Sequence, residues 1–439
     1  MYPNLYYFFK DWFGVEWQPL SFLNTFGLMV AIGFVAAAWT LTIELKRKEK
    51  QGLLQPREES IIVGQPASVS ELISNFILGF IFGYKFLGLF FAKPVDIPAQ
   101  EYIFSKEGSI LGGIAIALLM SGLKWWDKNK VKLKVPEKRT IRIWPHDRVG
   151  DIVIIALVFG ILGAKLFDNL EHWDEFWAHP IERLFSQSGL TFYGGLILAA
   201  IAVCWYATTK SIKLKHLMDA AAPGLMIAYA IGRIGCQVAG DGDWGIYNSA
   251  YVLDNQGKVV LANPGDFEKT LKKDSTYFLQ GKVIESGVVT YVTDRTYPNL
   301  QSVPHKSVKA PAFLPVWVYA YNYPQNVNRD GILMPQISDE HNRMLPSPVF
   351  PTPLYETIIC TVLFLIMWWK RKDIKTPYMM FGLYLSLNGI ERFMIEMMRV
   401  NITYGSVGLT QAEIIAIMLI VSGVILMVVS RKINKLVSV

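Results

Sequence analysis

About nine apolar runs, each close to the length that crosses a bilayer as one helix, constrain the fold of this chain more than any other feature. A hydrocarbon core needs roughly 20 mainly apolar residues per helix. With 52% hydrophobic residues over 439 positions, the chain is too apolar for a soluble protein of this size. The sequence therefore predicts an all-α polytopic membrane protein. The expected spans are 20–43, 70–92, 109–123, 151–167, 190–207, 217–239, 354–369, 378–400 and 412–430.

The Lys and Arg residues concentrate in alternate loops, and short basic loops favour the cytoplasmic side. If the N-terminus is outside, the inner loops hold the basic clusters at 46–57, 124–148, 210–215, 370–375 and 431–435. The short outer segments then hold only Lys10, Lys93, Lys106 and Arg183. We interpret the net charge of +7 as a topology signal and expect no nucleic-acid partner. The predicted topology is N-terminus outside and C-terminus in the cytoplasm.

The hydropathy pattern divides the chain into five regions. These are an outer segment with the first span (1–49), two spans with a basic cytoplasmic linker (50–150), spans four to six (151–240), a polar region (241–350), and spans seven to nine (351–439). The polar region contains the segments KVVLA and VVTYVT between turn residues, which predicts a small β-rich outer domain. The N-terminus lacks a basic segment before a short apolar core, so we expect the first span to be retained.

Ionisable side chains inside membrane spans are costly, which makes them candidates for function. Those near the predicted outer ends are Arg233, Glu356, Glu391, Arg392, Glu396, Arg399 and Glu413. In NGIERFMIEMMRVN, the spacing of Arg392, Glu396 and Arg399 places them on one helix face. This face is either a structural ion-pair ladder or an anion site, and arginine suits phosphate because its planar fork donates two hydrogen bonds. Asp219, at an inner end, is interpreted as a solvated helix terminus.

The sixth span ends in the motif AIGRIGCQVAGDGDWG. Glycines around Arg233 would let the backbone approach a ligand closely, because they lack a Cβ atom. A helix cap followed by a polar turn would explain the glycines but not the arginine. Asp241 and Asp243 follow in the same motif. We expect Cys236 to pack in the interior, since no histidine lies in a predicted span to activate it.

The fifth span opens with SGLTFYGG, which places Tyr193 beside Gly194 and Gly195. Anchoring in the aromatic belt and a role in a site both fit this position. Phe26 of the first span lies at the same expected depth. Several separate segments thus bring polar or glycine-rich motifs to one level.

The motifs together resemble bacterial prolipoprotein diacylglyceryl transferases in order, spacing and membrane side. They are FGLMVAIGF at Phe26, SGLTFYGG at Tyr193, GRIGCQVAGDGDWG at Arg233, PTPLYE ending at Glu356, and ERFMIEMMR at Glu391. The resemblance covers most of spans one and four to nine. It implies a bacterial inner-membrane location and marks 50–150 as an insertion.

The resemblance also implies an activity, in which the diacylglyceryl group of phosphatidylglycerol moves to the lipobox cysteine thiol of a preprolipoprotein and glycerol phosphate is released. The implied partners are phosphatidylglycerol, the lipobox segment and membrane lipid, and we expect no cofactor and no metal. The implied catalytic residues are Arg233, Arg392, Tyr193 and Glu396. The implied substrate-binding residues are Asp241, Asp243, Gly194, Gly195, Glu356, Arg399 and Phe26.

Three positions depart from the family pattern. Tyr193 replaces a histidine, Phe26 a tyrosine and Cys236 an asparagine, while either Asp241 or Asp243 stands for a family glutamate. We therefore assign Tyr193 to positioning or proton relay and leave the general base unnamed. The alternative functions are a polytopic lipid or solute transporter and a catalytically inactive lipid-binding relative. A transporter would carry its coupling charges near the bilayer midplane on broken helices, whereas here they cluster toward the outer ends.

Overall fold

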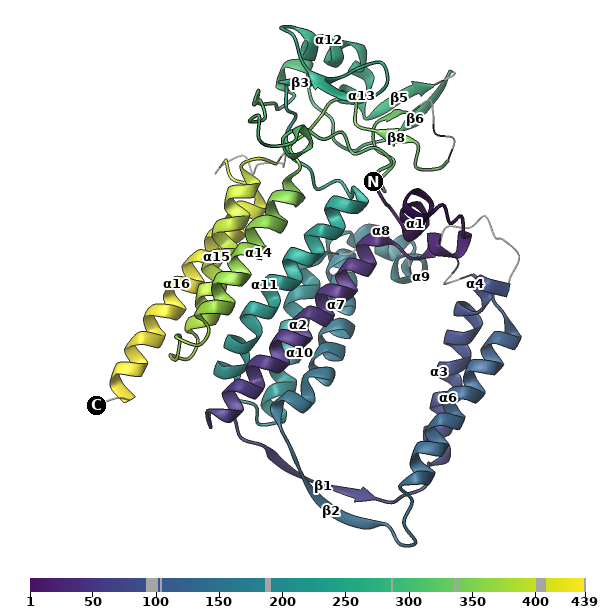
Figure 1. The fold of residues 1–439 in the computed structure, drawn as a ribbon, viewed down its shortest axis with the longest axis vertical. Helices are drawn as coiled ribbons and strands as arrows, with labels where there is room; N and C mark the ends of the chain where they lie inside the picture. Colours follow the sequence, from purple (N-terminus) through teal and green to yellow (C-terminus); the bar gives the residue numbers. More distant parts are fainter. Residues whose placement is uncertain are drawn as a thin grey trace. The chain divides into compact units, whose positions relative to one another are not determined.

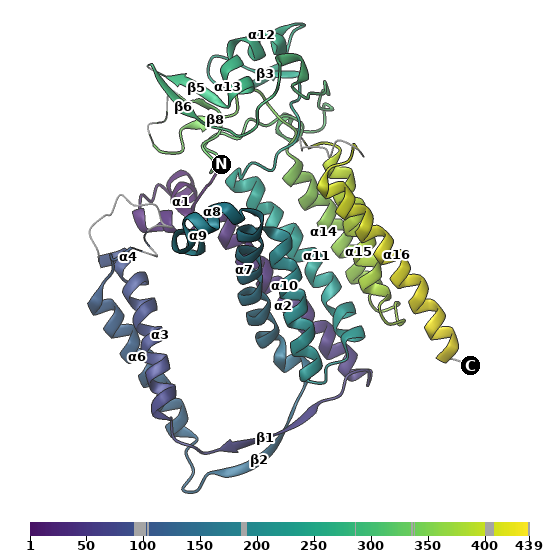
Figure 2. The ribbon, with the colours of Figure 1, turned by 180° about the vertical axis from the view of Figure 1, so that it is seen from behind.

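The computed structural model describes residues 1–91, 102, 105–185, 191–285, 287–334, 337, 339–399 and 408–437. Most of the described chain is helical, and the strands form only short two-stranded pairs. The chain forms two compact units, whose helices and strands are labelled in Figures 1 and 2. The first unit comprises 1–16, 24–44 and 215–439, and the second unit comprises 17–23 and 45–214.

The long helices of the first unit coincide with predicted spans. They are α2 (Thr25–Lys50), α11 (Leu214–Ala239), α14 (Thr352–Lys370), α15 (Met379–Glu396) and α16 (Gln411–Val437), and the short α1 (Leu5–Phe13) precedes them. Helices α15 and α16 lie side by side in both views (Figures 1 and 2), and small residues line their contact. A Cβ atom added at Gly389 would lie 2.7 Å from the Ala416 carbonyl oxygen. Close backbone approach at small residues is the usual way that membrane helices associate.

Charged side chains join these helices at the ends that are predicted to be cytoplasmic. Asp219, in α11, is 5% exposed, and its carboxylate accepts hydrogen bonds from the backbone N–H groups of Tyr378 at 2.8 Å and Phe381 at 3.0 Å. It therefore caps the start of α15, and the interpretation of Asp219 as a solvated terminus is wrong. Arg371 pairs with the buried Glu44 at 2.5 Å. Buried charges require such partners because burial removes their hydration.

The polar region 241–350 also belongs to the first unit. Its strands pair as β3 (Tyr251–Leu253) with β4 (Val259–Leu261), β5 (Lys282–Glu285) with β6 (Val288–Tyr291), and β7 (Ile332–Leu333) with β8 (Arg343–Met344), all antiparallel. Two short helices, α12 (Asp266–Lys273) and α13 (Ser275–Gln280), accompany them. Both predicted strand segments are confirmed, since KVVLA contains β4 and VVTYVT contains β6. The predicted β-rich domain is confirmed only in part, because its strands form small two-stranded pairs. Its location outside the membrane stays a prediction.

Aromatic side chains form the core of this polar region. The buried cluster includes Trp244, Tyr247, Phe278, Tyr323 and Val349. The Trp244 and Tyr323 rings lie 5.0 Å apart, and the Tyr323 hydroxyl donates to the Gln237 side chain of α11 at 2.8 Å. The core therefore ties the polar region to the end of the sixth predicted span.

The second unit contains a helix pair from the predicted core, α7 (Val149–Glu171) and α10 (Phe192–Thr209). The short helices α8 (Trp173–Ala178) and α9 (Pro180–Phe185) lie between them in the chain. Glycines lie where α7 and α10 meet. A Cβ atom added at Gly194 would lie 2.7 Å from the carbonyl oxygen of Gly163. A Cβ atom added at Gly195 would lie at the same distance, 2.7 Å, from the carbonyl oxygen of Gly160. The paired glycines after Tyr193 thus have a packing role in this interface.

Region 50–150, the predicted insertion, is a helical hairpin on a two-stranded ribbon. The hairpin comprises α3 (Val69–Phe86), the short α4 (Gly88–Phe91) and α6 (Ile110–Lys130), and the ribbon pairs β1 (Arg57–Val63) with β2 (Glu137–Ile143). A Cβ atom at Gly79 would lie 2.8 Å from the Ala117 Cα atom, so α3 and α6 also meet through small residues. The Lys85 ammonium donates to the carbonyl oxygens of Tyr102 and Glu107, both at 2.8 Å.

Seven of the described helices are long and apolar enough to cross a membrane. They are α2, α3, α6, α7, α11, α14 and α16. Helices α10 and α15 are not among these seven. The apolar part of α10, Tyr193–Thr209, is too short to be counted. Helix α15 carries three charged residues, Glu391, Arg392 and Glu396. Each predicted span coincides with a helix, but the count of nine spans stays a prediction.

Candidate active site

The residues with the most concentrated buried charge lie where α11, α14 and α15 approach the polar segment 240–250. Helix α11 carries Arg233 and ends at Ala239, after which Gly240 turns the chain with a φ of 68°. The chain then passes a narrow gap at Gly245, where an added Cβ atom would lie 2.7 Å from the Met398 carbonyl oxygen and 2.9 Å from Thr352 Cγ2. A side chain at this position would push apart the segments that form the site.

Arg233 contacts two carboxylates at once. Its Nε atom lies 2.9 Å from Glu356 Oε2, and its Nη1 atom donates to Asp243 Oδ2. The guanidinium carbon lies 5.2 Å from the centre of the Tyr229 ring, one helical turn earlier on α11. Because Glu356 is fully buried, its charge requires this partner.

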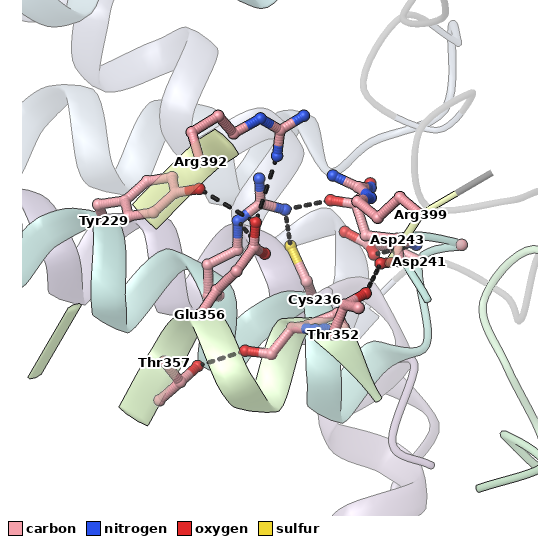
Figure 3. Close-up of polar contacts among 12 residues, drawn as sticks. Tyr229, Cys236, Asp241, Asp243, Thr352, Glu356, Thr357, Arg392 and Arg399 are labelled. Atoms are coloured by element: carbon pink, nitrogen blue, oxygen red, sulfur yellow. Dashed lines mark hydrogen bonds and ion pairs between the residues drawn. The ribbon is translucent and has the colours of Figure 1, made fainter. Parts of the chain in front are cut away.

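Glu356 is shared by a second arginine (Figure 3). The Arg392 Nη1 atom lies 3.2 Å from Glu356 Oε1, which also accepts a hydrogen bond from the Tyr229 hydroxyl at 3.2 Å. Arg392 Nη2 lies 3.3 Å from Glu396 Oε2, one turn along α15. Glu356 therefore holds two guanidinium groups beside each other.

Arg399 completes the cluster from beyond the end of α15. Its Nη2 atom donates to Asp243 Oδ1, so Asp243 also joins two arginines. The sequence pattern placed Arg399 on one helix face with Arg392 and Glu396, but the helix ends at Glu396 and Arg399 turns to the 240–245 segment. The predicted pair of Arg392 and Glu396 forms, whereas Arg399 pairs with Asp243.

The two aspartates of the motif differ in their electrostatics. Although burial raises the pKa of Asp243, the guanidinium groups of Arg233 and Arg399 lower it to about 2. For Asp241, burial and then the charge of Asp243 raise the pKa above its ordinary value. Asp243 is thus held as an anion between two cations, while Asp241 is the group that takes up a proton more readily.

Charges of both signs alternate through the cluster. Three arginines, Arg233, Arg392 and Arg399, face three carboxylates, Asp243, Glu356 and Glu396. Each guanidinium has five N–H donors, more than its ion pairs to these carboxylates engage. The geometry is suited to an anion that takes several of these donors at once, because charge-assisted bidentate contacts are the strong ones.

The donors of this cluster do not suit a metal ion. Cys236, Asp241 and Asp243 offer a thiol and two carboxylates within 4.8 Å of one another. However, Asp243 already pairs with two guanidinium groups, whose positive charge opposes a cation at the same place. The arrangement favours an anionic ligand over a cationic one.

The structure brings seven of the predicted site residues together in the first unit, namely Arg233, Asp241, Asp243, Glu356, Arg392, Glu396 and Arg399. Phe26, at the start of α2, packs beside α11, where an added Cβ atom at Gly235 would lie 3.3 Å from its ring. Tyr193, Gly194 and Gly195 belong to the second unit, in which the glycines pack against α7. Their role in the site stays a prediction.

Sequence reasoning missed three residues of the site. Tyr229 donates to Glu356, and its position four residues before Arg233 on α11 was an available signal. The Thr352 hydroxyl donates to the Asp243 carbonyl oxygen at 2.6 Å, and nothing in its local sequence indicates this partner 109 residues away. Gly245 was visible as a glycine, but its narrow surroundings were not.

The fold and site define a multi-pass membrane protein with a partly buried arginine cluster suited to an anionic ligand. The model of the prolipoprotein diacylglyceryl transferase family matches residues 130–429, more than half of the chain. The chain therefore belongs to this family, and the resemblance inferred from its motifs is confirmed.

Curated relatives carry the same description. The chain is 25% identical over 175 residues to a phosphatidylglycerol–prolipoprotein diacylglyceryl transferase of Leptospira interrogans, covering 35% of this chain and 53% of the relative. It is 30% identical over 147 residues to one of Dehalococcoides mccartyi, covering 34% and 52%, and 36% identical over 90 residues to one of Streptococcus agalactiae, covering 20% and 35%. The chain spans about half the length, or less, of these relatives.

Proposed function

We propose that this protein transfers the diacylglyceryl group of phosphatidylglycerol to the lipobox cysteine thiol of a preprolipoprotein. The observation that carries the proposal is the cluster of partly buried arginines on Glu356 and Asp243, in a chain of the prolipoprotein diacylglyceryl transferase family. The names of its relatives supply the lipid and the lipoprotein precursor as substrates.

The reaction is a substitution at an sp³ carbon. The thiol sulfur forms a bond to the glycerol carbon that carries the phosphate, and the bond from that carbon to the phosphate oxygen breaks. The bonding electrons leave with glycerol phosphate, and the thiol gives up its proton. Negative charge grows on the departing phosphate, so fixed guanidinium donors in a water-poor site stabilise the transition state more than the ground state.

Arg233 and Arg392 are the proposed phosphate ligands, because Glu356 fixes both guanidinium groups beside each other. Glu396 orients Arg392 from the next turn of α15, and Asp243 orients Arg233 and Arg399. In our proposal the phosphate takes up donors that remain on these arginines. We assign Tyr193 to positioning or proton relay and Phe26, Gly194 and Gly195 to substrate binding, and we assign no residue to removal of the thiol proton.

The proposal includes a location in the bacterial inner membrane with nine spans, an outer N-terminus and a cytoplasmic C-terminus. The alternation of basic loops supports it, as does the position of the arginine cluster at one end of α11, α14 and α15. Region 50–150 would be an insertion that places a helical hairpin in the membrane. Most of this hairpin precedes the matched family region.

The decisive experiment is incubation of the purified protein with phosphatidylglycerol and a lipobox peptide, followed by mass spectrometry. We expect the peptide to gain the mass of one diacylglyceryl group, and a peptide with serine in place of the cysteine to gain none. Phosphatidylglycerol binding without a mass change would identify an inactive lipid-binding relative. Lipid movement across vesicles, again without product, would favour a transporter.

A further inference from the structure

One buried carboxyl group beside the arginine cluster takes no part in the contacts described above. Glu391 lies on α15 immediately before Arg392, and it is 1% exposed. Among the residues that the structure describes, neither oxygen of its carboxyl group has a hydrogen-bond partner. Buried polar side chains in proteins are nearly always hydrogen-bonded, so an exception at a functional site requires a physical explanation.

Glu391 lies where the charged cluster meets the apolar interior of the first unit. Its carboxyl group is within electrostatic range of Glu356 and Arg233. It is also within range of Cys360 on α14 and Tyr384 on α15, which take part in an apolar cluster of α11, α14 and α15. The proposed phosphate ligands are therefore the charged neighbours of an otherwise apolar position.

The positive charges of the cluster are already balanced without Glu391. Three guanidinium groups face three carboxylates, Asp243, Glu356 and Glu396. A bound phosphodiester would add one more negative charge. An ionised carboxylate that has neither hydration nor a paired cation is very unfavourable in the interior. Glu391 therefore holds a proton in the resting site, and its O–H group is a donor for which a ligand can supply the acceptor.

We propose that Glu391 is the proton donor to the departing phosphate of the transfer reaction; the inference rests on the proposed function. The sulfur–carbon bond forms while the bond from that carbon to the phosphate oxygen breaks, and the bonding electrons pass to the oxygen. Glu391 gives this oxygen its proton and becomes a carboxylate. The thiol proton then restores the acid, so each turnover moves one proton from the thiol to the released glycerol phosphate.

Proton donation keeps the charge of the site constant. Without it, the phosphate would leave with two negative charges among arginines whose charges are already balanced. With it, the phosphate carries one negative charge before and after the reaction. General acid catalysis contributes about 10²–10⁴-fold to a rate. A carboxyl group that an apolar site keeps neutral is suited to this role.

The other carboxyl groups of the cluster are less suited to donate a proton. Glu356 and Asp243 each contact two guanidinium groups, whose positive charges favour the carboxylate form. Asp241 takes up a proton readily, but its Oδ1 atom accepts a hydrogen bond from the Asp243 backbone N–H at 3.4 Å. Glu391 differs from all three in having no cation and no hydrogen bond among the described residues.

The test compares Glu391→Gln with Glu391→Asp in the purified full chain. Glutamine keeps the size and the lack of charge but has no transferable proton, so a purely structural role would tolerate it. We expect transfer at saturating phosphatidylglycerol to fall about 100-fold or more, with unchanged phosphatidylglycerol binding. Glu391→Asp keeps the acid on a shorter side chain and should transfer about tenfold faster than Glu391→Gln.

The pH dependence is a readout that a structural role would not change. Titration of the thiol affects both proteins, so the rate of the unaltered protein is divided by that of Glu391→Gln. We expect this ratio to fall as pH rises, because the acid loses the proton that it donates. The titratable and charged groups around position 391 are the same in both proteins, namely Tyr229 and Arg233 on α11, Glu356 and Cys360 on α14, Tyr384 and Arg392 on α15, and Arg399 beyond it.

The matched control is Ser386→Ala, on the same helix. Ser386 is 7% exposed, and its hydroxyl oxygen also has no hydrogen-bond partner among the described residues. It faces Gly423 of α16 and not the arginine cluster. Removing this buried polar group should leave transfer per folded molecule within about twofold of normal.

Three results would overturn the role of Glu391: near-normal transfer by Glu391→Gln, a ratio that does not change with pH, or a loss of phosphatidylglycerol binding as large as the loss of transfer. The third would make Glu391 a binding residue. Each of these results requires that the unaltered protein transfers the lipid. If the unaltered protein formed no product, the proposed function itself would be refuted, so the two failures are distinguishable.

Discussion

Buried charges lie at both ends of the helices of the first unit, and the two groups are built differently. At the ends predicted to be cytoplasmic, Asp219 caps α15 through two backbone N–H groups, and Arg371 pairs with Glu44 while its guanidinium lies 3.5 Å from the centre of the Trp368 ring. The contacts of Asp219 and of Glu44 each join one helix to the end of another. Buried charge at this end is therefore part of the architecture.

At the opposite ends of α11 and α14, each of two carboxylates contacts two arginine side chains. Glu356 contacts both Arg233 and Arg392, and Asp243 contacts both Arg233 and Arg399. Shared carboxylates gather three guanidinium groups in one place, an arrangement that exceeds what is needed to join helices. The comparison teaches that a charge inside a span does not by itself indicate a ligand site, whereas several like charges gathered on shared partners do.

The largest predicted effect separates these two ends. Arg233→Gln should lower transfer at least 100-fold, because two charge-assisted hydrogen bonds contribute about 1.5–3 kcal/mol each and each 1.36 kcal/mol is about tenfold in rate. Arg233→Lys keeps the charge without the planar fork and should lose about tenfold or more. Thioether-lipid formation is measured at matched amounts of folded protein.

The matched control is Arg371→Gln, which removes a partly buried arginine from the other end of α14. It should reduce thermal stability, since it leaves Glu44 without this partner, while transfer per folded molecule stays near normal. Near-normal transfer by Arg233→Gln would instead make Arg233 a structural ion pair and erase the distinction between the two ends.

A second prediction tests the helix end that Asp219 caps. Asp219→Ala removes the acceptor for the Tyr378 and Phe381 N–H groups, and losing a helix cap costs about 0.5–2 kcal/mol. We expect a lower midpoint of thermal unfolding and unchanged transfer per folded molecule. If transfer fell as steeply as in Arg233→Gln with stability intact, Asp219 would have a functional role that its cap geometry does not explain.

The sequence predicted what depends on local pattern and missed what depends on distant partners. Apolar runs placed the helices, and the cost of buried charge was enough to single out Arg233, Glu356 and Arg392. The partners of Asp219 lie about 160 residues further along the chain, so no local pattern shows that it is a cap. Likewise, the sequence does not distinguish Asp241 from Asp243, because they lie only two residues apart. In the structure, Arg399 pairs with Asp243.

A third prediction concerns acid. The ion pairs of Asp243 hold its pKa near 2, below the ordinary aspartate value of about 3.9. A lowered carboxylate pKa stabilises the folded state above the unfolded pKa, and this stabilisation is lost as pH falls from about 4 to about 2. With its side chain 32% exposed, we expect a contribution of about 1–2 kcal/mol at most.

Unfolding curves of the unaltered protein and of Asp243→Asn between pH 6 and pH 2 measure this contribution. The variant should be less stable at pH 6, and the difference between the two proteins should shrink toward pH 2. A difference that stays constant over this interval would mean that Asp243 stabilises the protein through its shape and not through its charge.

The smallest predicted effect is at the end of the hairpin of α3 and α6. Lys130→Gln combined with Lys132→Gln removes two positive charges, one more than Arg233→Gln. Both lysines are exposed, and the Lys130 ammonium lies 3.8 Å from the centre of the Trp126 ring, a contact with a neighbour on the same helix. Exposed substitutions of this kind usually change stability by no more than about 0.5 kcal/mol, so transfer should stay within about twofold. If transfer collapsed in correctly inserted protein, the hairpin would belong to the catalytic machinery. Functional charge in this chain would then not be confined to the cluster of guanidinium groups, and the comparison between the two helix ends would lose its force.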